Sequence, residues 1–370
     1  MHTFGQSYMH VPALLGRTGL PVDAVMTSRH PLRSVRGIAR TYLTTPDRWS
    51  QTLEERLLTG EYQMLLNVDE PGLHALYRHS WHPEVARFLP FAPDSGTVAT
   101  VGSKMGFYDW CIRHGLPVPE TRRCASFREA CLLVEKLPGD WLLKADCGSG
   151  GVNVMRSPRE RESGTRPEEA ASWLVQRDEG HDVGSGIFLA DHGRLLSWMG
   201  IKKIVCLNRG YGPTVLGCGD TSEVVGQLCQ RVAAASGVTG LTGFDFVRSP
   251  ERGLGLIDSH LGRMSPMQHF DRLYSVDFAA ALRGHLDGTV CDVVAPQHGP
   301  GFIKFPEVLQ LAMQGGLGKL LKESRSAVKM PLSPRGDALI GLQSACQMVT
   351  SQARVNIGSW RRRLFPRPQR

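Results

Sequence analysis

The N-terminal part of the chain alternates short apolar runs with helical patterns. Residues 22–28 (VDAVMTS) and 62–68 (YQMLLNV) are apolar runs bounded by polar residues, a pattern typical of buried strands. A helical pattern follows each run, and alternation of this kind is typical of α/β domains. We therefore predict a small N-terminal α/β domain over residues 1–97. A helical pattern at 8–18 precedes the first run, which leaves open whether a first strand is missing from the sequence.

A second unit carries a longer series of elements. Residues 103–115 (SKMGFYDWCIRHG) predict a helix, because Ser103 is a suitable N-cap and Gly115 a suitable terminator. A second helix with a serine cap is predicted at 126–137. The remaining pattern predicts strands at 141–146, 172–177, 186–191 and 198–206, a helix at 221–236, a hairpin of 243–248 with 254–260, and helices near 275–286, 306–323 and 337–355.

The excess positive charge is concentrated at the C-terminal end. The net charge is +8, and the last ten residues (RRRLFPRPQR) hold five arginines and no acid, so the rest of the chain carries only +3. Binding of nucleic acid needs a basic face with interleaved aromatic residues, whereas aromatic residues make up 7% of the chain. We expect no nucleic-acid partner and a solvated tail, with a phosphate or membrane-surface contact of the tail as the alternative. We place the second domain at 98–290 and a C-terminal helical segment with this basic tail at 291–370.

The amino-acid composition limits the classes of protein to which the chain can belong. Apolar residues make up 41% of the chain, which allows a sizeable core. No apolar run reaches the length of about 18 residues that spans a bilayer, and the N-terminus lacks the pattern of a secretory signal. Nine scattered cysteines form no CxxC pair, which argues against a zinc site or a disulfide framework and for reduced thiols. We therefore expect a cytoplasmic protein without a membrane partner.

A lysine within a predicted strand precedes a glycine-rich loop. Lys144 has apolar neighbours in WLLKAD, and a buried lysine is costly unless it meets an anion. The strand leads into a loop of Gly148, Ser149, Gly150 and Gly151. Glycines leave backbone N–H groups free to approach phosphate oxygens, although no GxxxxGK[ST] motif of a Walker A loop is present. The glycines alone would be typical of a flexible turn, but together with Lys144 they favour binding of nucleotide phosphates.

Three residues that can bind a metal fall on the predicted hairpin GFDFVRSPERGLGLIDSH. Residues two apart in a strand share a face, so Asp258 and His260 point to the same side. If the two strands pair, Asp245 lies on the adjacent strand on that face, although the sequence does not fix the register. Such a set suits a divalent cation that bridges nucleotide phosphates. The alternatives are that Asp245 caps a turn and that His260 is an ordinary strand-end residue.

The order of these features resembles the ATP-grasp superfamily, most closely its carboxylate–amine ligase branch. The resemblance spans residues 98–288 and rests on the motifs SKMGFYDWCIRHGLPVPET, WLLKADCGSGGVNV, WLVQRDEGHDV and TGFDFVRSPERGLGLIDSHLGRMSP. It implies an α/β protein with an ATP-grasp fold, in which two α+β subdomains clasp ATP, preceded by a small α/β pre-ATP-grasp domain. No single motif is highly specific, so the order and spacing carry the resemblance.

The resemblance also implies roles for individual residues. The residues that match ATP-binding positions are Lys104, Lys144, Gly148, Ser149, Gly150, Gly151, Gln176, Arg177, Asp178, Asp182 and Lys202. A basic residue that contacts the phosphates matches either Lys202 or Lys203, and the arginine near the transferred phosphoryl group matches Arg263. Lys203 and Arg263 are the candidate catalytic residues. The residues that match the magnesium ligands are Asp245, Asp258 and His260.

The implied activity is ATP-dependent ligation of a carboxylate to an amine through an acyl phosphate, with release of ADP and phosphate. The implied cofactors are ATP and Mg²⁺ or Mn²⁺. The implied partners are small-molecule carboxylate and amine substrates, with a homodimer as a possible assembly. We expect the residues that bind the acceptor on the loops at 208–220 and 264–272, where Gly and Pro are frequent.

Three departures from the family pattern favour an alternative function. Asp258 stands in place of Glu, His260 in place of Asn, and Arg263 one position later than the family spacing. Magnesium prefers oxygen ligands, whereas manganese accepts an imidazole more readily. The alternative is a catalytically degenerate nucleotide-binding protein with a regulatory or scaffold role.

Overall fold

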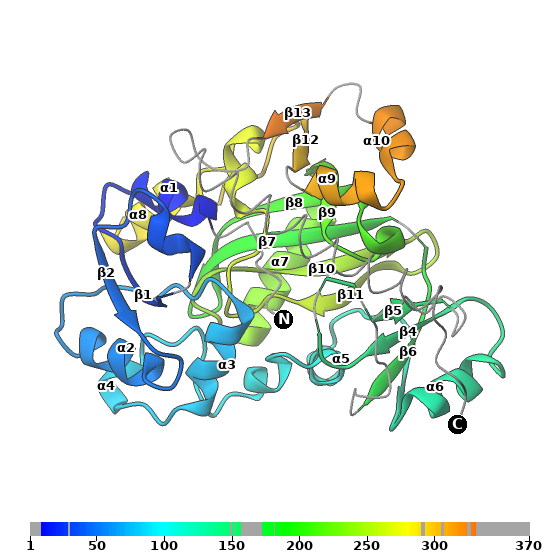
Figure 1. Ribbon diagram of the computed structural model, residues 1–370, viewed down its shortest axis with the longest axis horizontal. Coiled ribbons are helices and arrows are strands. Elements are labelled where there is room, and N and C mark those ends of the chain that lie inside the picture. The colour runs from blue at the N-terminus through cyan, green and yellow to red at the C-terminus, as the bar shows by residue number, and fades with distance from the viewer. Residues whose placement is uncertain are drawn as a thin grey trace, which may run out of the picture.

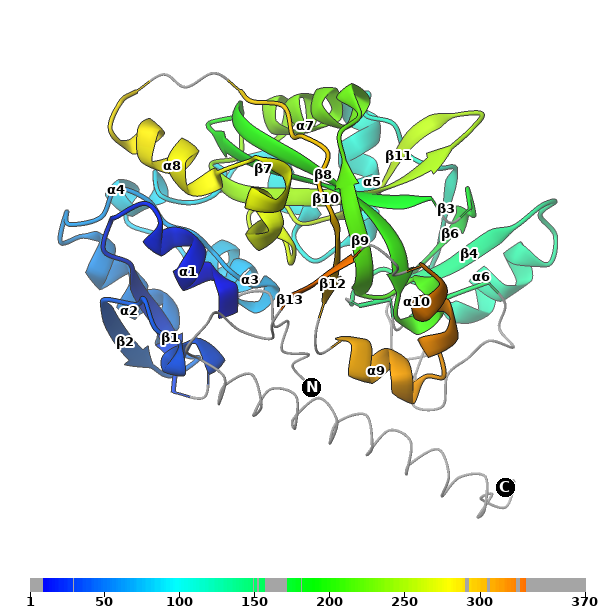
Figure 2. The same ribbon diagram turned by 90° about the horizontal axis from the view of Figure 1, so that it is seen from above.

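Three sheets organise the part of the chain that the computed structural model describes (Figure 1). The described residues are 9–28, 30–148, 150–151, 153–156, 172–180, 182–289, 293–304, 307–323 and 327–330. A two-stranded sheet lies in the N-terminal domain, and sheets of seven and four strands follow. Figures 1 and 2 both show the N-terminal elements on one side of the seven-stranded sheet and the four-stranded sheet on the other. This mixed α/β architecture confirms the predicted fold class.

The N-terminal domain combines two parallel strands with short helices. Its elements are β1 (Asp23–Thr27), β2 (Arg40–Thr44), α2 (Trp49–Leu57), α3 (Glu70–Arg78) and α4 (Pro83–Ala86). The strand predicted at 22–28 is confirmed as β1. The strand predicted at 62–68 is wrong, because this segment joins no sheet among the described residues. Its apolar side chains instead divide between two cores, with Leu65 on the helices of this domain and Leu66 on the seven-stranded sheet.

The seven-stranded sheet has the strand order β11-β10-β7-β8-β9-β12-β13. Its strands are β7 (Val183–Asp191), β8 (Arg194–Cys206), β9 (Thr214–Asp220), β10 (Gly240–Ser249), β11 (Gly253–Ser259), β12 (Gly301–Lys304) and β13 (Ala327–Met330). All neighbours are antiparallel except β12 and β13. The strands predicted at 186–191 and 198–206 are confirmed, as is the hairpin, which is β10 and β11.

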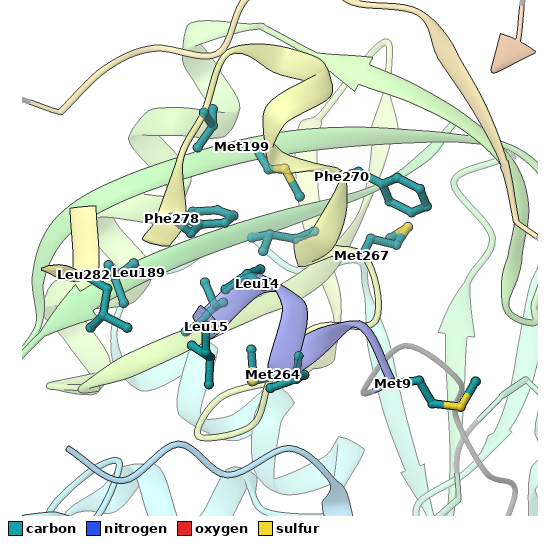
Figure 3. Close-up of a cluster of buried hydrophobic side chains, with 14 of the residues drawn as sticks. Met9, Leu14, Leu15, Leu189, Met199, Met264, Met267, Phe270, Phe278 and Leu282 are labelled. Carbon is teal, nitrogen blue, oxygen red and sulfur yellow. The ribbon is translucent and has the colours of Figure 1, made fainter. Parts of the chain in front are cut away.

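Helices cover both faces of this sheet. They are α1 (Val11–Gly16), α5 (Lys104–Arg113), α7 (Glu223–Ser236), α8 (Phe278–Leu286) and the 3-10 helix Gln268–Tyr274. Neighbouring strand residues point to opposite faces, so Phe188 packs in the core under α5 and α7 whereas Leu189 packs in the core under α1 and α8. Figure 3 shows Leu14 of α1 among the side chains of this second core. The helices predicted at 8–18, 103–115, 221–236 and 275–286 are confirmed.

Close packing between β7 and β10 fixes the alignment of these strands. Phe244 is paired with Gly186, and a Cβ at Gly186 would lie 2.4 Å from the phenyl ring. Phe246 is paired with Gly184, where a Cβ would lie 2.3 Å from the ring. Each ring therefore fills space that only glycine leaves open. Asp245, between the two phenylalanines, is consequently aligned with Ser185 on the opposite face.

The four-stranded sheet has one apolar face and one face that carries Lys144. Its strands are β3 (Thr121–Cys124), β4 (Trp141–Ala145), β5 (Val154–Met155) and β6 (Trp173–Arg177), in the order β3-β6-β4-β5. Helix α6 (Phe127–Val134) covers the apolar face, where Leu143 and Trp173 are buried. The strands and the helix predicted at 141–146, 172–177 and 126–137 are confirmed, whereas β3 was not predicted.

The C-terminal segment adds strands to the seven-stranded sheet as well as helices. Two helices, α9 (Glu307–Met313) and α10 (Leu317–Glu323), replace the single helix predicted at 306–323, because the intervening Gly315 and Gly316 disfavour a helix. The predicted helix at 337–355 and the basic tail lie outside the described residues. No helix among the described residues is long and apolar enough to cross a membrane.

Replacing Gly186 by alanine should lower the free energy of unfolding by about 1–3 kcal/mol, because the added methyl group must displace the Phe244 ring in a packed core. Urea denaturation of the purified protein measures the change. Gly16→Ala is the matched control, since nothing lies within 4 Å of a Cβ at that position. An equal loss of stability in both variants would contradict the argument that the rings fix the strand alignment.

Candidate functional site

The β10–β11 hairpin brings the three predicted metal ligands together. Asp245 of β10 is paired with Asp258 of β11, and a register shift follows Asp245. His260 lies just beyond β11, where its backbone N–H donates to the carbonyl oxygen of Gly243 at 3.0 Å. One ligand atom from each of the three side chains lies within 4.8 Å of the other two. The strand pairing thus supplies the geometry that the sequence pattern does not fix.

Burial and ion pairing set the charges of these side chains. The Asp245 carboxylate accepts hydrogen bonds from Lys203 at 2.6 Å and from Ser185 at 2.5 Å. Burial alone would raise the pKa of Asp245, but the positive charge of Lys203, the adjacent His260 and the hydrogen bonds from Lys203 and Ser185 together outweigh burial and lower the pKa to about 2. Burial lowers the pKa of His260 to about 4, and the imidazole is therefore neutral at neutral pH.

The cluster has the donor set of a divalent cation site. The Nδ1 atom of His260 is buried and has no hydrogen-bond partner among the described residues. A neutral imidazole nitrogen and two carboxylate oxygens form a mixed set that Mn²⁺ accepts, whereas Mg²⁺ prefers oxygen ligands. Asp245, Asp258 and His260 therefore fit a divalent cation, and Mn²⁺ better than Mg²⁺. Their role as metal ligands stays a prediction.

Lys144 is a buried cation on the facing sheet. Its side chain is only 7% exposed, and its Nζ atom donates to the Oε1 atom of Gln176 at 2.5 Å. Gln176 in turn donates from Nε2 to the hydroxyl oxygen of Thr121 at 3.0 Å. Burial lowers the pKa of Lys144 to about 8, and the negative charge of Asp258 opposes part of this shift. No carboxylate among the described residues forms an ion pair with Lys144, so its ammonium group can meet an anion between the two sheets.

Lys104 and the glycine loop lie beside these residues. The Nζ atom of Lys104 donates to the carbonyl oxygen of Gly148 at 2.5 Å. The carbonyl oxygen of Gly150 accepts from the Nδ2 atom of Asn208 at 2.7 Å, and Gly151 packs against the same segment after β8. The described part of the loop is thus held between α5 and the end of β8. The predicted Ser149 lies outside the described residues.

Two of the predicted nucleotide-binding side chains, those of Lys202 and Arg177, do not lie on the surfaces of the seven-stranded and four-stranded sheets that face each other. Lys202 forms an ion pair with Asp182 at 3.3 Å, on the opposite face of β8 from Lys203, because neighbouring strand residues alternate. Arg177 lies over the ring of Trp141, 6.0 Å from its centroid, at the apolar face of the four-stranded sheet.

Asp178 is the last of three consecutive residues, 176–178, that match ATP-binding positions. Its carboxylate forms an ion pair with Arg156 at 2.8 Å and accepts from the backbone N–H of Gly180 at 3.0 Å. Gln176 is the side chain of this segment that faces Lys144. Within this segment, Gln176 on β6 is thus hydrogen-bonded to Lys144, whereas Asp178 after β6 is engaged by Arg156 and Gly180.

A pocket that the sequence analysis did not predict lies beside the metal-ligand cluster. Its lining comes from α3, from the segment that leads into α5 and the start of that helix, from the glycine loop, and from the end of β11 and the turn after it. Its charged lining residues are Glu70, Lys104, Asp258 and Arg263. Glu70 was missed because DEPG at 69–72 reads only as a helix start, and nothing local places it beside a distant hairpin.

The loops predicted to bind the acceptor have a different structure. Residues 208–220 include β9 (Thr214–Asp220), a strand within the seven-stranded sheet. Residues 264–272 include most of a 3-10 helix whose Phe270 is 1% exposed. These parts are therefore not loops, because they belong to the packed sheet and its core. Binding of the acceptor by the two segments stays a prediction.

Comparison with known proteins gives a consistent fold. No protein-family model matches the sequence, and no similar protein is found among curated sequences. Similar solved structures include N5-carboxyaminoimidazole synthetase from Staphylococcus aureus, with 9% identity and a TM-score of 0.60 over 85% of this chain and 84% of that one. Carboxyaminoimidazole ribonucleotide synthase from Aspergillus clavatus complexed with ATP gives 14% identity and a TM-score of 0.57 over 80% and 77%.

A third similar structure is the biotin carboxylase domain of 2-oxoglutarate carboxylase from Hydrogenobacter thermophilus, complexed with MgADP, ADP and bicarbonate. It gives 13% identity and a TM-score of 0.56 over 80% of this chain and 71% of that one. The chain has the ATP-grasp fold. This confirms the fold that the order of the sequence motifs implied.

A turn after β11 accommodates the displaced arginine. Gly262 has a φ of +76°, and a Cβ there would lie 2.8 Å from the ring of Phe91. The backbone N–H of Arg263 donates to the carbonyl oxygen of His260 at 3.1 Å, which closes the turn. Arg263 consequently lines the same pocket as Asp258, although one extra residue separates it from the metal-ligand cluster.

Binding of ATP should be coupled to proton uptake by Lys144. The folded-state pKa of about 8 lies below the ordinary value, and phosphate oxygens next to the ammonium group would raise it again. At pH 8 the protein should therefore take up about half a proton per ATP bound. Calorimetric titrations in buffers of different ionisation enthalpy measure this number.

Two variants test the assignment of this proton. Lys144→Met should abolish the uptake, whereas Lys136→Met, at an exposed position after α6, should leave it unchanged. The same pKa gives the direction in which the free energy of unfolding changes with pH. Because the charged form is disfavoured in the folded state, stability should rise with pH between about 8 and the ordinary lysine pKa, and Lys144→Met should remove this rise. Proton uptake that persists in Lys144→Met would contradict the assignment.

Proposed function

We propose that the protein is an ATP-dependent carboxylate–amine ligase that forms an amide bond through an acyl phosphate and releases ADP and phosphate. The observation that carries the proposal is the buried ammonium group of Lys144. It forms no ion pair with a carboxylate among the described residues, and the negative charge that acts on it most strongly is that of Asp258 on the other sheet. A polyphosphate bridged to a divalent cation suits this arrangement. The similar structures that contain ATP or ADP support the same choice of ligand.

The nucleotide would lie between the two sheets. Lys144 and Lys104 would contact its phosphate oxygens, and the backbone of the glycine loop would close over them. Gln176 would face the base-proximal part of the nucleotide, because it shares the surface of β4 and β6 with Lys144. Asp245, Asp258 and His260 would hold a divalent cation, which neutralises charge on the phosphates when it is bound.

The proposed reaction has two displacement steps. A carboxylate oxygen of the donor attacks the γ-phosphorus of ATP, and the bond between the γ-phosphorus and the bridging oxygen breaks with its electron pair moving to ADP. An amine then attacks the acyl carbon, and phosphate leaves. Positioning and charge neutralisation lower both barriers, so no nucleophile of the protein is required. Arg263 would neutralise charge on the transferred phosphoryl group, since it lines the pocket next to Asp258.

A catalytically degenerate nucleotide-binding protein is the second candidate. One observation favours it, because the two carboxylate oxygens of Asp245 already accept hydrogen bonds from Ser185 and Lys203. A cation would have to share Asp245 with Lys203. In this case ATP would bind without a metal, and no acid would be phosphorylated.

Metal-dependent stabilisation by ATP distinguishes these two functions. ATP with Mn²⁺ at a hundredfold excess over the dissociation constant should stabilise the ligase by about 2.7 kcal/mol, and ATP without metal by much less. Thermal denaturation measures the shift. Lys144→Ala should lose most of it, whereas Lys136→Ala should retain it. Stabilisation that is independent of metal would support the degenerate binder, and no stabilisation of a folded sample would overturn both.

The substitution His260→Asn should change the preferred metal. An amide oxygen replaces the imidazole nitrogen, so activation by Mg²⁺ should increase relative to activation by Mn²⁺. Release of ADP measures activity in the presence of a panel of carboxylic acids that includes bicarbonate, and hydroxylamine traps acyl phosphates of organic acids as hydroxamates. His298→Asn, at an exposed position after α8, is the control and should not alter the metal preference. An unchanged Mg²⁺/Mn²⁺ ratio in His260→Asn would argue against His260 as a ligand.

A further inference from the structure

A turn between β8 and β9 lies between the glycine loop and the C-terminal helices. The backbone N–H of Leu207 donates to the carbonyl oxygen of Pro213 at 2.9 Å, and that of Gly212 donates to the carbonyl oxygen of Leu207 at 2.9 Å. Within this turn Asn208 has a φ of +50°, a left-handed conformation that asparagine adopts more readily than most residues. These backbone hydrogen bonds define the position from which the Asn208 side chain extends.

Asn208 is hydrogen-bonded on both sides of this turn. Its Nδ2 atom donates to the carbonyl oxygen of Gly150 in the glycine loop at 2.7 Å. Gln314, the residue directly after α9, forms two hydrogen bonds with Asn208. The backbone N–H of Asn208 donates to the Oε1 atom of Gln314 at 3.1 Å, and the Nε2 atom of Gln314 donates to the Oδ1 atom of Asn208 at 3.0 Å. Asn208 therefore links the end of α9 to the glycine loop.

The donors and acceptors in this series fix the orientation of both side-chain amides. The backbone N–H of Asn208 can only donate, so Gln314 must present its oxygen there and its nitrogen to the Asn208 side chain. Asn208 accepts with Oδ1 and consequently presents Nδ2 to the Gly150 carbonyl oxygen, which can only accept. Gln314 thus determines which atom of the Asn208 amide faces the loop. The opposite orientation would set two oxygen atoms against each other.

Hydrophobic packing holds Gln314 next to the turn. Leu311 of α9 and Leu320 of α10 are buried in one core with Leu207, the residue before Asn208. The backbone N–H of Gln314 also donates to the carbonyl oxygen of residue 311 at 3.1 Å. The exposed Gln314 side chain therefore extends from a backbone whose position relative to Asn208 is set by buried leucines.

The hydrogen bond from Asn208 also orients the next peptide group of the loop. A trans peptide places its carbonyl oxygen and its N–H on opposite sides. Because the Gly150 carbonyl oxygen points to Asn208, the N–H of Gly151 points away from the turn. Gly151 has a φ of +68°, and a Cβ there would collide with the carbonyl group of Tyr211, so only glycine allows this close approach.

From these contacts, and resting on the binding of ATP in the proposed function, we propose that Gln314 is a positioning residue for the glycine loop. Through Asn208 it holds the peptide group between Gly150 and Gly151 in the orientation that presents its N–H to a phosphate oxygen. The C-terminal segment, outside the domain that carries the lysines and the metal-ligand cluster, thereby contributes to the affinity for the nucleotide.

The test replaces the donor nitrogen of Gln314 by an oxygen. Gln314→Glu keeps the shape of the side chain and the acceptor for the Asn208 backbone N–H. The Asn208 amide should then turn its nitrogen to the new carboxylate, which breaks its hydrogen bond to Gly150. The Kd of ATP with Mn²⁺, measured by calorimetry, should rise by about tenfold or more. Gln314→Ala only leaves the Asn208 amide unconstrained and should raise the Kd by about threefold. A merely structural role predicts the opposite order, since Glu is the closer replacement.

Two controls separate this effect from the added negative charge. Met313→Glu places the same charge at the neighbouring position, where the side chain is 38% exposed, and should leave the Kd unchanged. Asn208→Gly removes the intermediate side chain at a φ that glycine adopts readily, and in this background Gln314→Glu should have no further effect. Thermal denaturation without nucleotide checks that each variant is folded.

The outcomes distinguish failure of this inference from failure of the ligase function. If Gln314→Glu binds ATP as the parent does, or if its loss equals that of Met313→Glu or persists in the Asn208→Gly background, the role of Gln314 is overturned and the ligase stands. If the expected order of Kd values is found but no acid gives a hydroxamate, the ligase is overturned and the role of Gln314 in ATP binding stands. If the folded parent protein binds no ATP, both are overturned.

Discussion

The burial of the Lys144 ammonium group is the physical constraint on which the site depends. A buried charge is strongly disfavoured unless an anion or several hydrogen-bond acceptors surround it, and Lys144 has the amide oxygen of Gln176. The negative charge that acts most strongly on Lys144 is that of Asp258, which belongs to the other sheet, followed by those of Asp178 and Asp245. A nucleotide polyphosphate between the sheets would complete the charge balance, and the two sheets would then hold one ligand from opposite sides.

The second constraint is the alignment of β7, β10 and β11. The rings of Phe244 and Phe246 rest on glycines of β7, and this packing on one face determines which residue lies on the other. Asp245 thereby meets Ser185 and Lys203, and its pairing with β11 brings Asp258 close. Hydrophobic packing in one core thus positions the polar cluster on the opposite face of the same sheet.

The pocket depends on contacts between segments that are far apart in the chain. Glu70 comes from the N-terminal domain, Lys104 from the start of α5 and Arg263 from the turn after β11. The segment at 62–68 helps to hold this arrangement, because the backbone N–H of Met264 donates to the carbonyl oxygen of Asn67 at 3.0 Å. A segment that looks like a strand in isolation therefore acts as a link between the N-terminal domain and the turn that carries Arg263.

The sequence by itself determined the features that depend on local periodicity and on order along the chain. The apolar runs of β7 and β8, the serine caps of α5 and α6, and the order of lysine, glycine loop and acidic hairpin sufficed to predict the ATP-grasp fold. Tertiary structure decided the rest, because the residues next to a side chain in the folded protein are not the residues next to it in the sequence. Lys202 and Lys203 were equivalent in the sequence, but the pleat sends them to opposite faces. Glu70 shows no local sign of a site, and only packing of α3 against the segment before Lys104 brings it to the pocket.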